Sequence, residues 1–214
     1  MKGLQHMKRK PILLDKVIKW KNNSPRQVIG MIGTHHGAGV THTGLMLAFY
    51  MGEELGKKTA YVECNHNHDM GLLQASYEWN EADEFSFTFH RITCYKDMGP
   101  NRIPEILSDD YECVIIDFGM DFAGNREEFL RCGRKVILTG QAEWELRKLE
   151  SFLQTLHLIH GSDAWIHLVS CINGKALTKL RTKLGNNIYA VPFNPNPILP
   201  SSNTCRLFDE LFLY

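Results

Sequence analysis

Short runs of consecutive apolar residues alternate along this chain with segments whose apolar residues recur at helical spacing. The apolar runs are predicted to be strands, at residues 28–33, 59–63, 112–117, 135–139, 165–172 and 188–191. Because these runs are apolar throughout, both faces of the sheet that they form must be covered. The pattern predicts an α/β fold of three layers, in which helices cover both faces of a mostly parallel, twisted sheet.

Most segments between these runs are predicted to be helices. Helical spacing covers residues 41–55, 70–79, 103–107, 126–132, 143–160, 175–184 and 204–213. Gly56 is placed to end the first of them. Residues 85–95, rich in aromatic and β-branched side chains, are predicted to contain at least one strand. Ligands of parallel sheets bind at the carboxyl ends of the strands, so the residues that follow each strand are the functional candidates.

The chain has 214 residues, of which 43% are hydrophobic and 22% charged, as in an ordinary globular domain. Residues 27–214 are predicted to form a single domain. No run of eighteen apolar residues occurs and the N-terminus lacks the apolar core of a signal peptide, so a cytoplasmic location is expected. The six cysteines form no CxxC pair, which favours reduced thiols, with Cys113 and Cys171 in buried strands.

The first residues form a basic arm, predicted to span residues 1–26. Residues 1–27 hold eight lysines and arginines against the single acidic residue Asp15, which leaves sixteen basic and twenty-three acidic residues elsewhere. Pro11 suits the first position of a short amphipathic helix. The arm is suited to bind nucleic acid, an acidic partner or an anionic membrane surface, which would make the protein peripheral; alternatively it folds back onto its own acidic domain.

A glycine-rich loop follows the first predicted strand and leads into the first predicted helix. Residues 33–42 have the sequence GTHHGAGVTH. A strand, a glycine-rich turn and a helix N-terminus together favour phosphate binding, because backbone N–H groups and the helix dipole face the anion. Gly37 and Gly39 let the backbone turn its N–H groups inward, and Thr41 offers a hydroxyl for Mg²⁺.

This loop resembles the deviant Walker A motif KGGxGK[TS][TS] of the ParA and MinD ATPases and of TadZ-type pilus-assembly proteins. Gly37, Gly39 and Thr41 match the motif, and Ala38 occupies its variable position. The resemblance extends in order over residues 27–214. It implies a P-loop fold of the MinD and ParA kind, bound ATP or ADP with Mg²⁺, and a homodimer that forms through the phosphate-loop face.

Four later segments carry the same resemblance. Glu63 and Asn65 follow the second strand at the family's DxD-like positions, and Asp117 ends YECVIID, which is similar to the Walker B strand. Asn173 closes a later strand where the family has the residue that contacts adenine, and Pro192 lies in a turn similar to IPYD. The resemblance implies that Asp117 holds the water shell of Mg²⁺ and, if the protein is active, that Glu63 orients the attacking water.

The loop departs from the motif at both positions that carry a lysine. His35 replaces the signature lysine, and Val40 replaces the Walker lysine that contacts the β and γ phosphates. His36 stands in place of the first glycine and His42 in place of the last hydroxyl residue. Because such cations contribute orders of magnitude to the rate, efficient ATP hydrolysis is not expected. Gly37, Gly39 and Thr41 still match the motif, so the sequence remains compatible with nucleotide binding.

Three functions fit this combination. The first is a non-hydrolysing or very slow nucleotide-binding scaffold that positions a pilus or secretion apparatus, as the TadZ-type resemblance implies, without a sequence-specific nucleic acid partner. The second is an active ATP-dependent dimerisation switch in which Lys57, Lys58 or a lysine of the arm replaces the missing cations. The third, an iron–sulfur or metal-handling relative, lacks the paired CxxC that such relatives use.

Histidines are concentrated after the first two strands. His35, His36 and His42 follow the first strand, and His66 and His68 follow the second. Glu63, Cys64 and Asp69 lie beside the second group. Histidine and cysteine bind transition metals, but the spacing matches no closed zinc signature and exposed loop histidines are common. A protonated His35 or His36 would instead help to hold phosphate below about pH 6.5. His167 is predicted to be a satisfied core residue, and Trp165 and Phe193 are predicted to lie in the core.

Overall fold

The computed structural model describes residues 25–77, 81–89 and 91–213. The basic arm and its predicted helix lie outside the described residues, apart from Pro25 and Arg26. The Nε of Arg26 donates a hydrogen bond of 2.8 Å to the carbonyl oxygen of Tyr111. Within the described ranges, no helix is both long and apolar enough to cross a membrane.

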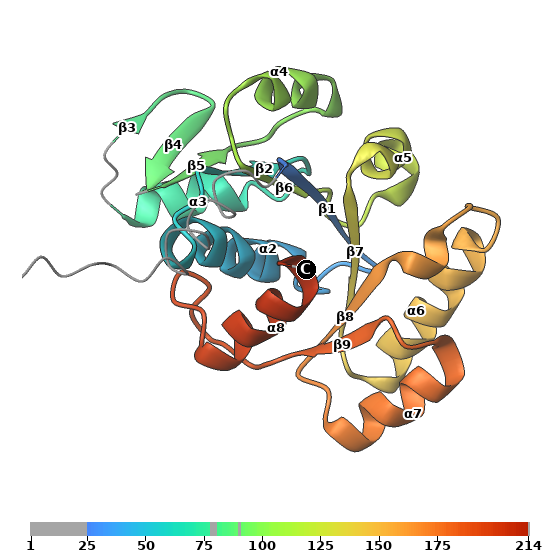
Figure 1. Ribbon diagram of the computed structural model, residues 1–214. Helices are drawn as coiled ribbons and strands as arrows, with labels where there is room; N and C mark the ends of the chain where they lie inside the picture. Colours follow the sequence, from blue (N-terminus) through green and yellow to red (C-terminus); the bar gives the residue numbers. More distant parts are fainter. Residues whose placement is uncertain (1–24, 78–80, 90, 214) are drawn as a thin grey trace, which may run out of the picture.

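The described residues form one twisted sheet of nine strands in the order β3-β4-β5-β2-β6-β1-β7-β8-β9 (Figure 1). The strands are β1 Gln27–Gly33, β2 Thr59–Glu63, β3 Glu81–Ala82, β4 Ser86–Phe89, β5 Ile92–Tyr95, β6 Cys113–Asp117, β7 Arg134–Thr139, β8 Ile166–Ser170 and β9 Ile188–Val191. From β5 to β9 in the sheet order, all neighbours pair in parallel. β3, β4 and β5 pair antiparallel at one edge. The mostly parallel sheet is confirmed.

Helices cover both faces of this sheet. The helical segments are α2 Val40–Phe49, η1 Tyr50–Glu54, α3 Asp69–Ser76, η2 Pro100–Arg102, α4 Ile103–Ser108, α5 Phe122–Arg131, α6 Glu143–Leu156, η3 Ser162–Ala164, α7 Gly174–Leu184 and α8 Ser202–Phe212. Apolar residues of α2, α3 and α8 pack in one cluster on one face. Those of α4, α5, α6 and α7 pack in a second cluster on the other face. The three-layer architecture is therefore confirmed.

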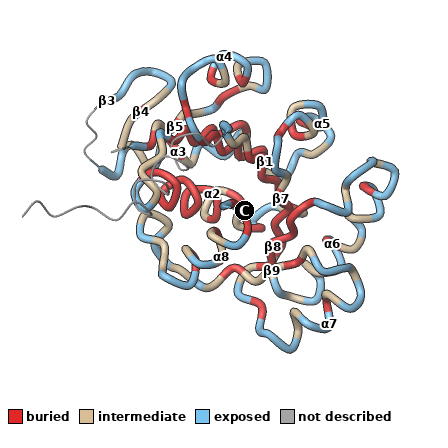
Figure 2. The backbone as a smooth tube through the Cα atoms, in the orientation of Figure 1, coloured by how far each residue is buried: buried red, intermediate tan, exposed pale blue. Residues whose placement is uncertain are grey.

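The core lies along the central strands, which Figure 2 shows as buried. Every residue of β2 and β6 is buried. Successive side chains of β6 enter opposite clusters, with Ile115 on the α2 side and Ile116 on the α6 side. These continuous apolar runs are what a sheet covered on both faces requires.

The register of the central strands sets the position of the phosphate loop. Met31 of β1 and Glu63 of β2 both align with Asp117 at the end of β6. The carboxyl ends of these three strands therefore meet at one edge of the sheet, here called the carboxyl edge. The loops that follow them are neighbours in space.

The first long helix differs from the single helix predicted over 41–55. α2 ends at Phe49 and continues as the π-helix η1, whose wider turn keeps Tyr50, Met51 and Gly52 buried. The N–H of Lys57 then bonds to the carbonyl of Met51 at 3.0 Å, and Gly56 takes a left-handed φ of 68°. Gly56 thus ends the segment as predicted.

Two predictions of burial are wrong. Cys171 is exposed, because β8 ends at Ser170 and Cys171 turns away with a left-handed φ of 58°. Phe193 follows β9 and is 75% exposed. Both residues lie where the chain leaves the sheet, so their apolar character does not imply burial. Cys113 and Trp165, which the sequence also places in the core, are buried.

Candidate functional site: the phosphate loop

The loop between β1 and α2 has the backbone of an anion cradle. Gly37 and Gly39 take left-handed φ angles of 82° and 88°, which residues with a Cβ rarely adopt. Gly39 is the N-cap of α2 and leaves the first N–H groups of that helix without a side-chain cap. The loop borders a cavity of about 400 Å³ lined by residues 35–42 together with Asn67, Asp69, Gly119 and Met120.

Thr41 and Asp117 meet at the carboxyl edge, as the sequence predicts for a Mg²⁺ site. The Thr41 hydroxyl donates a hydrogen bond of 2.7 Å to Asp117 Oδ2, and the Tyr61 hydroxyl donates another of 2.7 Å to the same oxygen. The N–H of Gly119 donates to Oδ1 at 2.8 Å. Asp117 is fully buried, and burial raises the pKa of its carboxyl although these hydrogen bonds oppose the shift.

Val40 lies at the border of the cavity, but its side chain is packed in the protein. It is 7% exposed and belongs to the apolar cluster on the α2 face. Its Cγ2 lies so close to Gly33 that a Cβ there would be only 3.0 Å away. Val40 is therefore a packing residue at the position where the resemblance places the Walker lysine.

His35 is held by neighbouring side chains. Its Nδ1 lies 2.9 Å from the hydroxyl of Thr34, and its Nε2 lies 3.2 Å from Glu145 Oε1. Glu145 also accepts the N–H of Ala142 at 2.9 Å and so caps the start of α6. The ring at the signature-lysine position is thus engaged by a carboxylate from α6.

The two other loop histidines differ in their surroundings. His42 Nε2 donates to the carbonyl of Asn194 at 2.7 Å, which connects α2 to the turn after β9. His36 is exposed and lines the cavity. Among the described residues that line this cavity, none is a lysine or arginine. The loop therefore combines a polar cradle with very little positive charge.

Glu63 is placed away from the phosphate loop. It is fully buried, and its carboxylate accepts the N–H groups of Met70 at 3.1 Å and Asp97 at 3.2 Å. Burial raises the pKa of this carboxyl, and the two N–H donors oppose the shift. Glu63 fastens the start of α3 to β2, and it does not line the cavity. Asn65 instead faces β6, where its Nδ2 donates to the Asp117 carbonyl at 3.2 Å.

Asn173 and Pro192 follow β8 and β9 at the carboxyl edge, as predicted. The Asn173 side chain accepts the N–H of Ala176 at 2.9 Å and caps α7. Pro192 is half-buried directly after β9. Neither residue lines the loop cavity, so the adenine contact of Asn173 and the binding of nucleotide by Pro192 stay predictions.

Lys57 and Lys58 lie far from the phosphate loop, and the histidines after the first two strands form no metal-ligand group in the described ranges. Lys57 and Lys58 precede β2, at the opposite edge of the sheet; Lys58 pairs with Asp110, and the Lys57 Nζ contacts the Gln27 side chain. The prediction that either reaches the phosphates is wrong, because parallel strands carry their first residues to the far edge. Within residues 25–77, 81–89 and 91–213, no three histidine, cysteine or acidic side chains converge as metal ligands.

Several large apolar side chains in the segments after strand ends are exposed, which sequence reasoning did not predict; one of them, Met120, lines the loop cavity. Those that follow strand ends at the carboxyl edge, each at least 59% exposed, are Leu72, Met120, Trp144, Phe193 and Leu199. Exposed large apolar side chains are candidates for an interaction site. Their sequence signal is position, because each follows a strand end by two to nine residues.

No protein-family model and no curated protein matches the sequence of this chain. Among solved structures, the MinD cell division protein of Aquifex aeolicus is 15% identical, with a TM-score of 0.63, over 86% of this chain and 97% of that one. A ParA family ATPase from Chlorobium tepidum is 13% identical, with a TM-score of 0.60, over 79% and 85%.

A third structure similar to this chain carries a nucleotide analogue. It is a plasmid partition protein from Borrelia burgdorferi bound to AMPPNP, 10% identical with a TM-score of 0.64 over 89% of this chain and 99% of that one. Identities this low establish the fold and nothing finer. The order of the strands, the loop after β1 and these three structures together show that the chain has the fold of the ParA and MinD ATPases.

Proposed function

We propose that this chain is a ParA/MinD-like P-loop protein that binds ATP or ADP with Mg²⁺ and hydrolyses ATP very slowly or not at all. One observation carries the proposal. The metal side of the loop is intact, with Thr41 on Asp117, whereas Val40 is packed into the core and His35 is bound to Glu145. Backbone N–H groups and the helix dipole bind a phosphate without either lysine.

The absence of the two lysines affects mainly the chemical step of ATP hydrolysis. Charge on the transferred phosphoryl group is stabilised by cations at fixed positions, and each contributes orders of magnitude to the rate. Glu63 is fully buried with both carboxylate oxygens bonded to backbone N–H groups. Its carboxylate thus binds backbone N–H groups and does not line the loop cavity. A bound nucleotide therefore acts as a structural ligand and is not hydrolysed to drive a conformational change.

The exposed apolar residues at the carboxyl edge support a homodimer that forms across the phosphate-loop face. Trp144 and Met120 stand beside the loop and are 69% and 59% exposed. Apolar side chains exchanged across a two-fold axis stabilise a dimer without the lysines that the family's motif supplies. A MinD protein from Aquifex aeolicus is known in complex with MinC, which supports a protein partner for the present chain as well.

In this proposal the protein is a positioning factor of the TadZ type for a pilus or secretion apparatus. The basic arm contacts the partner or an anionic surface. Sedimentation of the full chain and of a chain lacking residues 1–24, with and without anionic vesicles, tests the arm separately. Equal vesicle binding by the two chains excludes the arm as the contact.

Dimer formation is tested by sedimentation velocity with no nucleotide, with ADP and with ATP, each with Mg²⁺. We expect the dimer to be favoured by nucleotide and to be weakened by Trp144→Glu. Loss of a central aromatic side chain costs at least about 2 kcal/mol at an interface, or about thirtyfold in Kd. Leu158→Glu is the matched control, because Leu158 is 91% exposed beyond the other end of α6. Equal effects of the two variants, or a monomer in all conditions, reject the dimer.

A further inference from the structure

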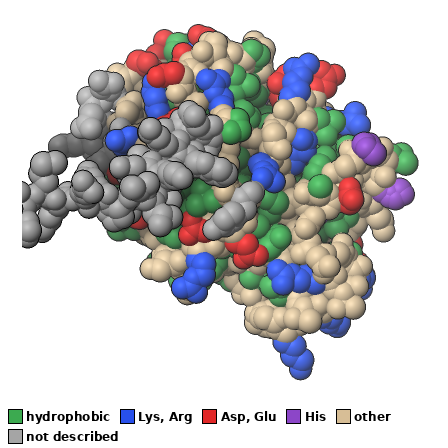
Figure 3. Space-filling view, viewed as in Figure 1, with side chains coloured by type: hydrophobic (Ala, Val, Ile, Leu, Met, Phe, Trp, Pro, Cys, Tyr) green, Lys and Arg blue, Asp and Glu red, His purple; other side chains and the backbone are tan. Residues whose placement is uncertain are grey.

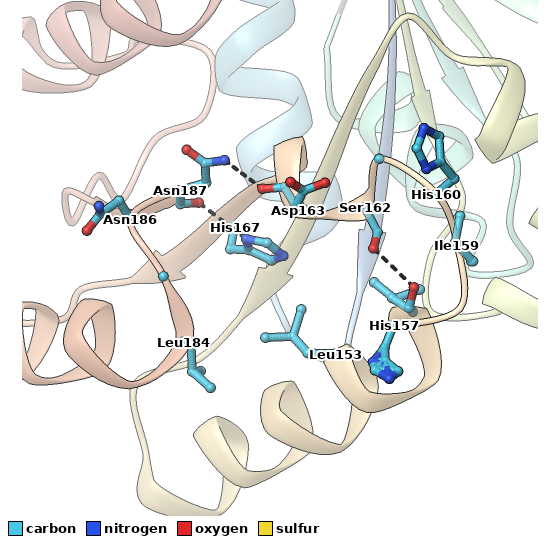
Figure 4. Close-up of a pocket in the computed structure, with 13 residues that line it drawn as sticks. Leu153, His157, Ile159, His160, Ser162, Asp163, His167, Leu184, Asn186 and Asn187 are labelled. Atoms are coloured by element: carbon cyan, nitrogen blue, oxygen red, sulfur yellow. Dashed lines mark hydrogen bonds between the residues drawn. The ribbon is translucent and has the colours of Figure 1, made fainter.

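A second cavity lies at the edge of the sheet opposite to the phosphate loop (Figure 4). Its volume is about 570 Å³, within the range of binding sites for small organic molecules. The end of α6, the turn through η3, the start of β8 and the turn between α7 and β9 enclose it. None of the residues assigned to the phosphate loop lines this cavity.

His167, the second residue of β8, lines the cavity with a buried ring. Its relative exposure is 7%. The ring Nδ1 lies 3.3 Å from the carbonyl oxygen of Asn187. A carbonyl oxygen only accepts hydrogen bonds, so Nδ1 carries the hydrogen and Nε2 presents a lone pair. Burial lowers the pKa of His167, which keeps this ring neutral.

The Nε2 of His167 is the exception among buried polar atoms. Across the part of the chain that the structure describes, it is the one buried side-chain nitrogen or oxygen without a hydrogen-bond partner. The prediction of a fully satisfied core histidine is therefore wrong. An unpaired buried polar atom costs about 1–3 kcal/mol, and such atoms in native proteins call for a ligand, a water molecule or a functional reason.

Two other polar side chains of the cavity are already paired. The Ser162 hydroxyl donates to the Leu156 carbonyl at 3.0 Å, and the Asn187 side chain donates to the Asp163 carbonyl at 2.8 Å. The apolar walls are formed by Leu153, Leu156, Ile159 and Leu184. The cavity thus offers an incoming molecule apolar contact and one buried acceptor.

The two nearby histidines are exposed, and their rings do not converge with His167. Figure 4 shows the rings of His157 and His160 directed away from it, and Figure 3 shows histidine side chains at the surface on one side of the molecule. No group of three metal-binding side chains occurs among the described residues. This arrangement favours an organic ligand over a metal ion.

We propose that this cavity binds a small, largely apolar organic molecule with one neutral N–H or O–H donor, which bonds to His167 Nε2. Indole is a suitable probe because it combines an apolar body with a single N–H donor. 1-Methylindole is its matched control, since it keeps the body and lacks the donor. Their comparison needs no change in the protein.

The test is a titration of the full chain with each probe, followed by NMR of the histidine ring signals. A neutral hydrogen bond is worth about 0.5–1.5 kcal/mol, so indole should bind about two- to tenfold more tightly than 1-methylindole. Indole should also shift the His167 Nε2 signal. His167→Phe should remove the preference for indole, whereas His160→Ala should keep it.

Several results would overturn the proposal. Absence of indole binding, or equal affinities for indole and 1-methylindole with an unshifted His167 signal, rejects the donor contact. A water molecule that stays bound to Nε2 in the presence of indole shows that water alone satisfies the atom. Zinc that shifts the signals of His157, His160 and His167 together would identify a metal site instead.

Discussion

The two sides of the phosphate loop differ in how far they agree with the deviant Walker A motif. On the metal side, Thr41 and Asp117 stand in direct contact, with further donors from Tyr61 and Gly119. On the cation side, where the motif has lysines, Val40 is buried in an apolar cluster and His35 is bound by Glu145. The difference teaches that a loop can have the backbone of a phosphate cradle without a lysine at either position, because other residues set its backbone angles.

The two sides of the loop should contribute separately to nucleotide binding and to ATP hydrolysis. Gly37 and Gly39 retain the left-handed backbone that presents N–H groups to an anion. His35 and Val40 stand at the two positions where the motif carries lysines. Variants on the two sides of the loop should therefore affect different measurements.

Val40→Lys should have the largest effect, because it restores positive charge to the cation side. A charge-assisted contact to phosphate is worth about 1.5–3 kcal/mol, so ATP should bind about ten- to a hundredfold more tightly by calorimetry. The substitution should also lower the free energy of unfolding, since the Val40 side chain leaves the core cluster.

Val40→Met is the control for this prediction, because it adds length without charge. We expect no gain in ATP affinity from it. An equal gain from Val40→Met, or none from Val40→Lys, would mean that positive charge at this position is not what the cradle lacks.

Asp117→Ala should have the next largest effect, on the metal side. Tyr61 and Gly119 lose their acceptor, and an unpaired buried donor costs about 1–3 kcal/mol in the free energy of unfolding. Mg²⁺ should no longer strengthen ATP binding. Urea unfolding and calorimetry with and without Mg²⁺ measure the two effects, and a preserved Mg²⁺ dependence would place the metal elsewhere.

Glu145→Gln should have a smaller effect. The glutamine keeps an acceptor for the Ala142 N–H, while the negative charge beside His35 is removed. Partly exposed ion pairs are worth about 0.2–1 kcal/mol, so ATP affinity should rise by at most about fivefold. Glu143→Gln, in the same exposed turn of α6, is the control and should change nothing. A weaker affinity in Glu145→Gln would contradict the account of His35.

Asp117→Asn should have the smallest effect, and it depends on pH. Burial raises the pKa of Asp117 in the folded state, so protonation of this carboxyl stabilises the folded protein. This stabilisation is complete below the pKa of the unfolded chain and is lost as pH rises through the pKa of the folded state. Asparagine carries no charge but has only one acceptor oxygen, so it cannot accept both from Gly119 and from the Thr41 and Tyr61 hydroxyls as the carboxylate does. Because only the parent gains stability from a proton at this site, the stability of the variant relative to the parent should fall from pH 7 toward pH 4 in urea unfolding. A relative stability that rises toward low pH would contradict the raised pKa.

Much of the fold follows from local sequence patterns. Apolar runs such as that ending in Asp117 specify buried parallel strands, and the loop glycines specify a left-handed turn. The meeting of Thr41 with Asp117 also follows, because both lie just beyond or at a strand end on one edge. Parallel pairing converts positions in the sequence into neighbours at that edge.

The details of the site depended on contacts between distant segments. Glu145 reaches His35 from 110 residues away, and no local pattern reports that pairing. Glu63 looks catalytic from its position at the end of β2, yet burial and two backbone donors make it structural. Whether an apolar side chain in the segments that follow a strand is buried, as Val40 is, or exposed, as Phe193 is, depends on tertiary packing.

Calorimetry with ATP and Mg²⁺, combined with phosphate release measured on the same sample, tests the central claim most directly. The account predicts ATP binding that Mg²⁺ strengthens, with no phosphate release above that of the Asp117→Ala variant. Phosphate release that Asp117→Ala abolishes would show a working ATPase, and absence of binding with Mg²⁺ would show that the cradle holds no nucleotide; either result contradicts the account.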